Sequence, residues 1–251
     1  MSYKIYLSPA NHKKSYYYKK YNEKQQMEII APLLFEELKK YEGLEPIMTT
    51  VFDGDGQYTG RPEEARSKNC DIYVALHSNA GGGKGACLFY HPAYELSKAL
   101  ALSLVGELNR VCPIKSNRAV QPAIYPWSLT EWNLGELREP AKYGMAPVLI
   151  EHEFHDTPDG ATWLVNNSRT IAEADARAIA ATLGAMRKTL KGDFNGDGKV
   201  DSFDASLVLK YEVGLIDADA DTLSRVDMNG DGKVNSLDAS LILRKEAGLI
   251  K

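Results

Sequence analysis

The chain has 251 residues, and its 44% hydrophobic and 25% charged residues are the proportions of a soluble globular protein. The formal net charge is −4, and residues 191–251 account for all of it with twelve acidic and eight basic side chains. Because the rest of the chain is neutral overall, no net-basic domain is present to neutralise phosphates, so we expect no nucleic-acid partner. No apolar run approaches the length of a membrane span.

The N-terminus and the cysteines bear on the compartment. The opening segment MSYKIYLSPANHKK lacks the apolar core of a signal peptide. We therefore expect an intracellular chain, another route of export, or a signal that has been removed. The three cysteines, Cys70, Cys87 and Cys112, are an odd number without metal-like spacing. We interpret them as reduced and mostly buried thiols.

Strand-like and helix-like patterns alternate through the first 190 residues. Strands are predicted at residues 4–8, 46–52, 71–77, 86–91 and 146–154, and helices at 23–41, 61–69, 92–111 and across 159–188. Pro32 lies inside the first of these helices, where proline favours a kink. The alternation predicts an α/β domain with a central, mostly parallel sheet flanked by helices. In such sheets, ligands bind at the carboxyl ends of the strands.

Polar residues follow three of the predicted strands, in the segments LSPANH, ALHSN and IEHEFHD. His12 and His77 therefore lie where the sheet predicts a site, and Glu23 opens the first long helix beside the same edge. Zinc in hydrolases typically takes three His or carboxylate ligands and keeps one position open. Each residue also has a simpler interpretation. A histidine at a strand end is usually a hydrogen-bonded surface residue, and a glutamate favours a helix N-terminus.

Four segments resemble, in order, the sequence blocks of zinc-dependent N-acetylmuramoyl-L-alanine amidases: IYLSPANH, NEKQQMEIIAPLL, DIYVALHSNA and APVLIEHEFHDTP. The resemblance covers about residues 3–187 and implies a catalytic domain over residues 1–188. It also implies that His12, Glu23 and His77 hold a catalytic zinc ion, with Glu28 as the alternative to Glu23. In this family a glutamate on the last core strand acts as general base and acid, and the matching residue is Glu151.

The segment LIEHEFHDT, residues 149–157, contains several other polar side chains. On a regular strand, Glu151 and His152 point to opposite faces, so they cannot both face one metal ion. We therefore interpret Glu151 as catalytic. The remaining polar residues are expected to form hydrogen bonds around the site, with His155 the best candidate for a role: His152, Glu153, His155 and Asp156.

Further residues are expected around a substrate groove. Arg118 resembles a family position near the groove, where it would bind a substrate carboxylate or form a surface salt bridge. The tyrosines of SYYYKKY would line the groove or form a partly buried loop. The loop NAGGGKGA is interpreted as part of the groove rim, and Trp127 and Trp132 fall in an irregular stretch that would cover the site.

An internal repeat fills the C-terminal segment: residues 193–216 and 227–250 are identical at 17 of 24 positions. Each copy opens with a twelve-residue loop that is rich in oxygen donors. The two loop sequences are DFNGDGKVDSFD and DMNGDGKVNSLD. Ca²⁺ takes six or more oxygen ligands, so each loop is a predicted calcium site. A single helix follows each loop, which makes the repeat half of an EF-hand, twice. The predicted ligands are Asp193, Asn195, Asp197, Lys199, Asp201 and Asp204 in the first loop and Asp227, Asn229, Asp231, Lys233, Asn235 and Asp238 in the second.

The duplicated loop–helix, with Asp at the twelfth loop position, resembles type I dockerin modules over about residues 191–251. The resemblance implies a small all-α domain over residues 189–251 that folds on two calcium ions and binds a cohesin module of a scaffold protein. In that family the partner contacts loop positions ten and eleven and basic residues of the following helix. The matching residues are Ser202, Phe203, Lys210, Ser236, Leu237, Arg244 and Lys245.

The two resemblances together imply a peptidoglycan hydrolase that uses zinc to cleave the amide between N-acetylmuramic acid and L-Ala of the stem peptide. A zinc peptidase acting on the stem is an alternative, since the same ligand set would serve it. A non-catalytic wall-binding protein is a second alternative, against which the intact residue set argues. We expect action outside the cell on the wall, by a scaffold-borne enzyme secreted with its signal removed or by a phage-type lysin.

Overall fold

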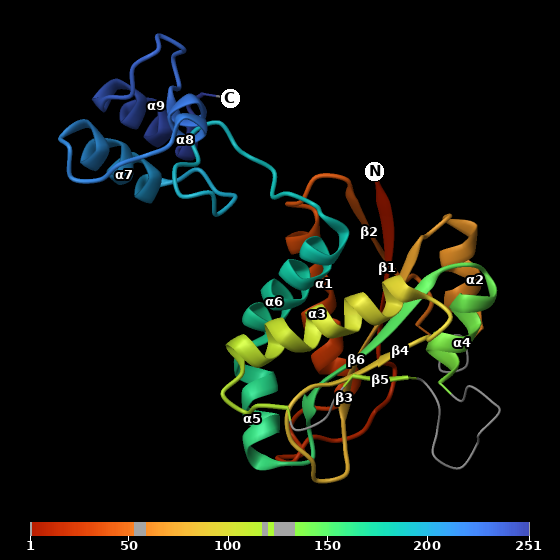
Figure 1. Ribbon diagram of the computed structural model, residues 1–251. Coiled ribbons are helices and arrows are strands. Elements are labelled where there is room, and N and C mark those ends of the chain that lie inside the picture. Colours follow the sequence, from red (N-terminus) through yellow and green to blue (C-terminus); the bar gives the residue numbers. More distant parts are fainter. Residues whose placement is uncertain (1, 53–58, 117–119, 123–133, 251) are drawn as a thin grey trace. The chain divides into compact units, whose positions relative to one another are not determined.

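The computed structural model describes residues 2–52, 59–116, 120–122 and 134–250. The chain forms two compact units, Met1–Met186 and Arg187–Lys251, which are drawn in Figure 1. The first unit is a sheet with helices on both faces, and the second consists of short helices and loops. The predicted α/β fold with a small all-α unit is therefore confirmed. No helix of the described residues is long and apolar enough to cross a membrane.

Among the described residues, the sheet has six strands in the order β2-β1-β3-β6-β4-β5. They are β1 (Tyr3–Pro9), β2 (Leu44–Met48), β3 (Ile72–Asn79), β4 (Cys87–Tyr90), β5 (Gln121–Pro122) and β6 (Ala146–Phe154). β2, β1, β3 and β6 run parallel, and β4 is antiparallel to β6. The central strands are nearly continuous apolar runs, as strands buried on both faces require. Because β1, β3 and β6 run parallel, their carboxyl ends meet at one edge of the sheet.

Helices cover both faces of the sheet, as Figure 1 shows. One face packs against α1 (Glu23–Leu38), α3 (Glu95–Val111), α5 (Pro158–Asn166) and α6 (Ser168–Leu183), and the other against α2 (Gly60–Ser67) and α4 (Gly135–Lys142). The strand period of two determines which side chain enters which core. Ile5 and Leu7 belong to the larger core, and Tyr6 between them belongs to the smaller core.

A local hydrogen-bond pattern fixes the start of α1. The Asn22 side chain accepts the backbone N–H of Gln25, and the Gln25 side chain accepts the backbone N–H of Asn22. This reciprocal capping box satisfies donors that the first helical turn leaves free. It places Glu23 in the first turn of α1, beside the sheet edge, and the helix then continues through Pro32 to Leu38.

Several short elements differ from the predictions. β2 ends at Met48, before the predicted end at residue 52, because Thr49 and Val51 form a local turn in which Val51 N–H donates to Thr49 Oγ1 at 3.1 Å. The predicted helical region at 159–188 resolves into α5 and α6, which meet at Asn167. α4 was not predicted, because it is only eight residues long, contains Pro140 and is mostly polar.

The C-terminal unit has two loop–helix repeats. Its helices are α7 (Ser202–Glu212), α8 (Ala220–Val226) and α9 (Ser236–Glu246), of which α7 and α9 follow the loops as predicted and α8 was not predicted. Its core cluster of buried hydrophobic residues consists of Ala205, Val208, Val226, Ala239 and Ile242. Such a small core stabilises a domain weakly, because folding must also offset the conformational entropy of the chain.

Candidate active site

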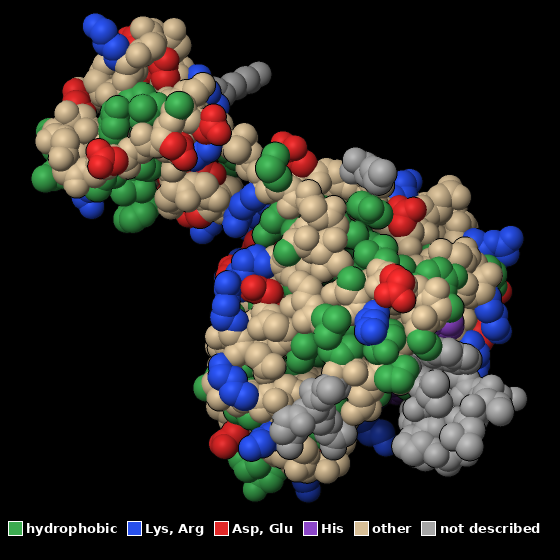
Figure 2. Space-filling model, viewed as in Figure 1, with side chains coloured by type: hydrophobic (Ala, Val, Ile, Leu, Met, Phe, Trp, Pro, Cys, Tyr) green, Lys and Arg blue, Asp and Glu red, His purple; other side chains and the backbone are tan. Residues whose placement is uncertain are grey.

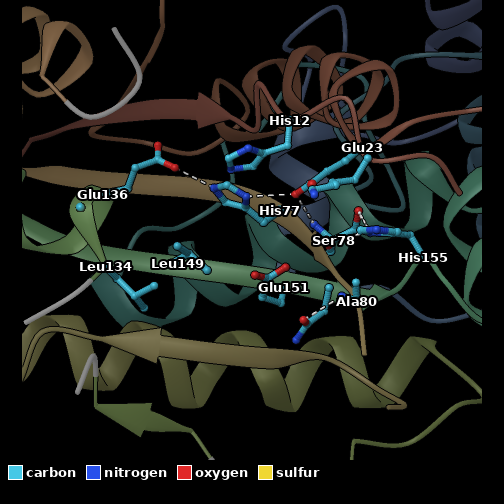
Figure 3. Close-up of a pocket in the computed structure, with 13 residues that line it drawn as sticks. His12, Glu23, His77, Ser78, Ala80, Leu134, Glu136, Leu149, Glu151 and His155 are labelled. Carbon is cyan, nitrogen blue, oxygen red and sulfur yellow. Dashed lines mark hydrogen bonds and ion pairs between the residues drawn. The ribbon is translucent and has the colours of Figure 1, made fainter. Parts of the chain in front are cut away.

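The residues predicted to carry the chemistry line one cavity of about 390 Å³ at the carboxyl edge of the sheet. His12 follows β1, Glu23 opens α1, His77 lies near the end of β3 and Glu151 lies on β6. Figure 3 shows these side chains pointing toward one another from the four elements. The structure therefore brings together residues that are separated by up to 139 positions in the chain.

His77 lies at the centre of this arrangement. Its Nδ1 is 3.0 Å from Glu23 Oε1, and the same Glu23 oxygen accepts the backbone N–H of Ser78 at 3.2 Å. The ring of His12 lies beside it, with 5.6 Å between the ring centroids. In the sheet register His77 pairs directly with Glu151, so both side chains leave the same face of the sheet.

Glu151 is half-buried as a residue, but its Oε2 atom is enclosed and has no hydrogen-bond partner among the described residues. Burial raises the pKa of Glu151 to about 7, because the charged carboxylate loses its hydration. The neighbouring carboxylate of Glu23 raises this pKa further, and His77 opposes the shift. A carboxyl group with a pKa near neutrality is suited to take up and return a proton.

The donors in the cavity fit a zinc ion by their chemistry. Two imidazoles and a carboxylate are the ligand types of catalytic zinc sites. The Glu151 Oε2 atom, which has no hydrogen-bond partner among the described residues, could accept a hydrogen bond from a water molecule or a substrate. Within the described residues, no group of three or more His, Cys, Asp and Glu side chains is spaced to hold a metal ion as it stands.

The remaining polar residues of the segment 149–157 have separate partners. His152 is buried on the opposite face, where its Nε2 lies 2.8 Å from Asp175 Oδ2 on α6 and its Nδ1 lies 2.9 Å from the His77 carbonyl oxygen. The carboxylate of Asp175 raises the pKa of His152, although burial alone would lower it. His152 thus anchors the backbone of His77 from behind.

The strand alternation breaks after Glu151. From the His77–Glu151 pair to the next pair in the register, β6 advances three residues while β3 advances two. This irregularity turns Glu153 away from the cavity, and its carboxylate accepts the backbone N–H of Gly85 at 2.8 Å. Asp156 accepts the backbone N–H of Gly81 at 2.7 Å. Both carboxylates therefore hold the glycine-rich loop that was predicted as the groove rim.

His155 does line the cavity, next to a buried tyrosine. The Tyr16 ring stacks on the His155 ring with 5.1 Å between centroids and 2° between the planes. Tyr17 and Tyr18 are exposed, so the tyrosine segment is partly a buried support and partly surface. Glu28, the alternative ligand, is exposed and lies 3.7 Å from Lys24 as an ion pair.

Three residues predicted around the groove, Arg118, Trp127 and Trp132, lie outside the described residues. One residue of the site was missed by the sequence reasoning. Glu136, on α4, lines the cavity and places its Oε2 2.7 Å from Nε2 of His77. No helix was predicted around Glu136, so nothing in the sequence indicated that its side chain faces the sheet edge.

The two loops of the C-terminal unit that were predicted to bind calcium are closed by backbone donors. Asp193 accepts the N–H of Gly198 at 2.8 Å, and the buried twelfth-position residue Asp204 accepts the N–H of Phe194 at 2.9 Å. The equivalent residues Asp227 and Asp238 do the same in the second loop, with Gly232 and Met228 as donors at 2.9 and 2.7 Å. Gly198 and Gly232 both have φ of 80°, which only glycine adopts readily.

The ninth-position residues of these loops, Asp201 and Asn235, are the N-caps of α7 and α9, and their side chains accept the N–H of Phe203 and Leu237. The loops thus present clustered carboxylate and amide oxygens and nucleate the following helices. These are the donors that calcium prefers.

Comparisons with known proteins agree with this architecture. A family model described as N-acetylmuramoyl-L-alanine amidase matches residues 11–181, and one described as dockerin type I domain matches residues 191–245. No curated protein matches the chain.

Solved structures share the fold. An N-acetylmuramoyl-L-alanine amidase from Clostridium difficile 630 aligns over 73% of this chain and 97% of its own, with 20% identity and a TM-score of 0.60. The catalytic domain of CwlV from Bacillus (Paenibacillus) polymyxa var. colistinus aligns over 73% and 99%, with 19% identity and a TM-score of 0.59. AmiC2 of Nostoc punctiforme aligns over 72% and 97%, with 18% identity and a TM-score of 0.58.

Proposed function

The chain belongs to the N-acetylmuramoyl-L-alanine amidase family and carries a type I dockerin domain, and from this premise we propose that it cleaves peptidoglycan with a zinc ion held by His12, Glu23 and His77. The bond broken is the amide between N-acetylmuramic acid and L-Ala of the stem peptide. We assign residues 1–188 to the catalytic domain and residues 189–251 to the calcium-binding domain. The site of action is the cell wall, outside the cell.

One observation carries the proposal: residues from four separate elements converge on one cavity, with Glu151 beside His77 in the sheet register. When bound, a zinc ion supplies Lewis acidity that polarises the scissile carbonyl and lowers the pKa of a water molecule. His12, Glu23 and His77 are the donors for it. His152 and the capping box of α1 fix the backbone positions from which two of these donors project.

Glu151 provides the proton transfer. Its enclosed Oε2 atom has no hydrogen-bond partner among the described residues, so it is available to take the proton of the attacking water. The same carboxyl then gives that proton to the L-Ala nitrogen as the amide bond breaks. The metal-free pKa of about 7 for Glu151 decreases when a cation binds beside it, which favours the ionised, basic form.

The reaction is tested by digesting purified peptidoglycan with the full chain, loaded with zinc and calcium, and with Glu151→Gln. We expect the wild type to release stem peptides with new L-Ala amino termini and to create no new reducing sugar ends, both read by mass spectrometry. Glu151→Gln is expected to lose about 10²- to 10⁴-fold in rate, the usual contribution of a general acid–base group.

A matched control separates this loss from a general effect of removing a carboxylate. Glu153→Gln neutralises another buried carboxylate of β6, which accepts the backbone N–H of Gly85 and does not line the cavity, and the variant is expected to remain active. Trimmed stems still joined to glycan would contradict the amidase proposal and indicate a stem peptidase. Wall binding without any product would indicate a non-catalytic binder.

We also propose that the C-terminal unit binds two calcium ions and docks to a cohesin module of a scaffold protein. Both repeats present large hydrophobic side chains to solvent at equivalent positions, and Figure 2 shows such side chains at the surface of this unit. Phe203 and Leu237 at loop position eleven are 57% and 52% exposed. Leu209 and Leu243, one turn and a half further along each helix, are 43% and 44% exposed. The exposed Phe203 and Leu237 coincide with the loop positions that the dockerin resemblance assigns to partner contact.

Docking is tested with a panel of purified type I cohesin modules and the calcium-loaded chain. We expect at least one module to bind, and the combined variant Phe203→Asp with Leu237→Asp to abolish that binding while calcium binding persists. Unchanged binding of the double variant would contradict the assigned surface.

A further inference from the structure

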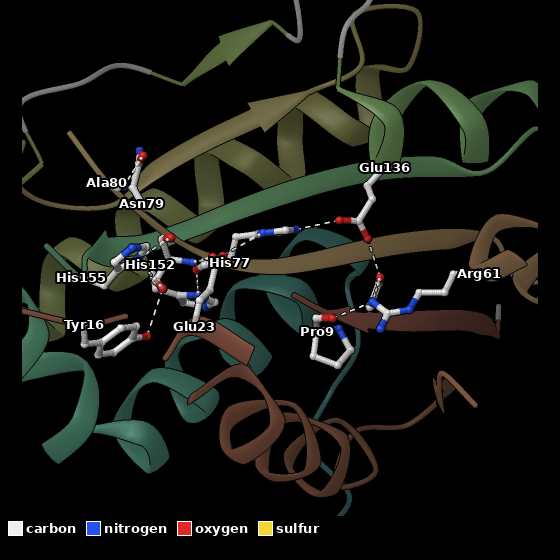
Figure 4. Close-up of polar contacts among 12 residues, drawn as sticks. Pro9, Tyr16, Glu23, Arg61, His77, Asn79, Ala80, Glu136, His152 and His155 are labelled. Carbon is white, nitrogen blue, oxygen red and sulfur yellow. Dashed lines mark hydrogen bonds and ion pairs between the residues drawn. The ribbon is translucent and has the colours of Figure 1, made fainter. Parts of the chain in front are cut away.

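Glu136 is a carboxylate in the wall of the proposed catalytic cavity. Glu136 projects from α4 and is 2% exposed. Its Oε2 lies 2.7 Å from Nε2 of His77, while Nδ1 of the same ring faces Glu23 at 3.0 Å. Figure 4 shows the His77 ring held between these two carboxylates. The two ring nitrogens thus have different partners, only one of which is a proposed metal ligand.

The second oxygen of Glu136 is fixed by groups that lie away from the cavity. Oε1 accepts hydrogen bonds from the hydroxyl of Ser8 on β1 and from Tyr73 Oη on β3, the latter at 3.1 Å. The Ser8 hydroxyl in turn accepts a hydrogen bond from Arg61 Nη1 at 2.9 Å. Figure 4 shows this continuous chain of contacts from Arg61 to His77.

Arg61 is itself buried, at 1% exposure, and is held by backbone oxygens. Its Nη1 donates to the Pro9 carbonyl at 2.6 Å and its Nε to the Val51 carbonyl at 2.8 Å. Burying a guanidinium and a carboxylate is costly unless each is paired and hydrogen-bonded, and apolar residues of similar volume would fill this space more favourably. The network reaches the cavity at Glu136, whose carboxylate contacts the His77 ring.

The chemistry of the contact assigns the roles of the ring nitrogens. An ionised carboxylate is only an acceptor, so Nε2 of His77 carries the hydrogen in the contact with Glu136. Nδ1 faces the Glu23 carboxylate, which is itself a proposed ligand, so a metal ion held by both groups would take the place of the hydrogen on Nδ1 and leave the Nε2 hydrogen with Glu136. Histidine ligands of metals almost always donate their other N–H to such a group, which fixes the tautomer and the ring orientation.

We propose that Glu136 is a positioning residue, which accepts the Nε2 hydrogen of His77 and presents Nδ1 of that ring to the metal. The hydrogen bonds from Ser8 and Tyr73, with Arg61 behind Ser8, keep the Glu136 carboxylate in place. The proposal rests on the zinc site proposed above. It goes beyond that site because Glu136 lies outside the ligand set and touches neither the water nor the substrate in this role.

The test measures zinc affinity of the full chain in calcium-saturated buffer, by competition with a chromogenic zinc chelator. Glu136→Ala is expected to weaken zinc binding by about 10- to 100-fold, the usual effect of losing an outer-shell partner. Glu136→Gln keeps an acceptor oxygen and is expected to lie between Glu136→Ala and the wild type. His77→Ala gives the effect of losing a ligand, and Glu153→Gln gives the effect of neutralising a buried carboxylate elsewhere on the sheet.

Far-UV circular dichroism establishes which variants fold, and Glu136→Gln retains the shape of the side chain if Glu136→Ala does not fold. A second readout is the visible absorption spectrum of the cobalt-loaded chain. We expect it to change in Glu136→Ala, because the His77 ring loses its fixed orientation, and to stay unchanged in Glu153→Gln. A merely structural role of Glu136 would lower the melting temperature and leave both the spectrum and the zinc affinity unchanged.

Three results would overturn the proposal in distinguishable ways. Zinc affinity of both Glu136 variants within twofold of the wild type would show that Glu136 does not position the ring. A loss as complete as that of His77→Ala would show that Glu136 is itself a ligand. Failure of the wild type to bind zinc at all would overturn the zinc site of the proposed function, and this inference with it.

Discussion

The two units of the chain bury carboxylates in opposite ways. In the catalytic unit, Glu23, Glu136 and Asp175 are each buried and paired with a histidine side chain. In the C-terminal unit, Asp204 and Asp238 are buried among backbone N–H donors of loops around a core of five residues. The three carboxylates of the first unit thus each face a histidine, whereas the two aspartates of the second are held by backbone N–H groups of their own loops.

The comparison assigns different roles to the two metals. The large core holds the catalytic fold together, so the proposed zinc ion serves the reaction. The small core leaves the C-terminal unit dependent on an additional source of stability, as domains of about 60 residues usually are. The proposed calcium ions supply it, because binding to a site that exists only in the folded state is also free energy of folding.

The largest effect expected from this contrast is unfolding on calcium removal. A calcium-selective chelator should abolish the tertiary structure of the C-terminal unit and leave the catalytic unit folded. Tryptophan fluorescence reports only the catalytic unit, because all three tryptophans, Trp127, Trp132 and Trp163, precede residue 187. Two-dimensional NMR of the whole chain would show loss of dispersion confined to residues 187–251. A C-terminal unit that stays fully dispersed without calcium would break the comparison.

The next effect concerns the buried pair behind the active site. Asp175→Asn removes the charge that faces His152, and both side chains are fully buried. Breaking such a pair typically costs about 3–5 kcal/mol of folding free energy. We expect this loss in urea unfolding of the catalytic unit, followed by tryptophan fluorescence. Asp159→Asn, an exposed residue at the start of α5, is the control and should change stability by less than about 0.5 kcal/mol.

Removing a proposed ligand should alter zinc binding more than stability. Glu23→Gln is expected to lower zinc affinity by more than the roughly 100-fold upper limit of outer-shell changes. Glu28→Gln, one turn further along the same helix and exposed, should leave zinc affinity unchanged. Isothermal titration of the calcium-saturated chain measures both variants. The reverse pattern would show that Glu28 is the ligand and that the register of α1 was assigned wrongly.

The smallest effect is a pH dependence in the catalytic unit. Burial raises the pKa of Glu64, but hydrogen bonds from Lys68, Thr50 and Tyr6 outweigh burial and lower this pKa to about 2. A lowered folded-state pKa stabilises the protein above the unfolded-state pKa and loses that effect as pH falls toward the folded-state value. At 1.36 kcal/mol per pKa unit the shift corresponds to at most about 3.4 kcal/mol, and solvent screening of this partly exposed group reduces the expected cost of Glu64→Gln at pH 6 to roughly 1–2 kcal/mol.

The difference between wild type and Glu64→Gln should shrink by more than half between pH 6 and pH 3. Urea unfolding at a series of pH values measures it. Glu63→Gln, on the same helix and exposed, should show no such trend. A difference that stays constant with pH would mean that the Glu64 contacts are neutral hydrogen bonds with no charge contribution.

Sequence predicted the parts of the molecule whose structure depends on a pattern within one short segment of the chain. Buried parallel strands read as apolar runs, and β3 and β6 were found near their observed bounds for this reason. The two loop–helix repeats were predicted because each loop pattern lies within twelve consecutive residues and is followed by a helix with apolar periodicity. His77 and Glu151 were predicted at the sheet edge because each lies near the carboxyl end of a predicted parallel strand, and such ends share one edge of the sheet.

The parts that sequence did not predict depend on tertiary contacts. The hydrogen bonds that suggest a role for Glu136 are made with His77, Ser8 and Tyr73, which lie on other elements. The irregular register after Glu151 is likewise invisible in a strand pattern, and it changes the environment of Glu153. Short polar elements such as α4 and α8 have too few apolar residues for a periodic signal.

The central claim is that zinc in the first unit performs amide cleavage while calcium maintains the second. The most direct test is digestion of purified peptidoglycan by the metal-free chain after addition of zinc alone, calcium alone or both, with mass spectrometry of the products. We predict that zinc alone restores the release of stem peptides with L-Ala amino termini and that calcium alone does not. Release by calcium alone, or release of trimmed stems that leave L-Ala on the glycan, would contradict the account.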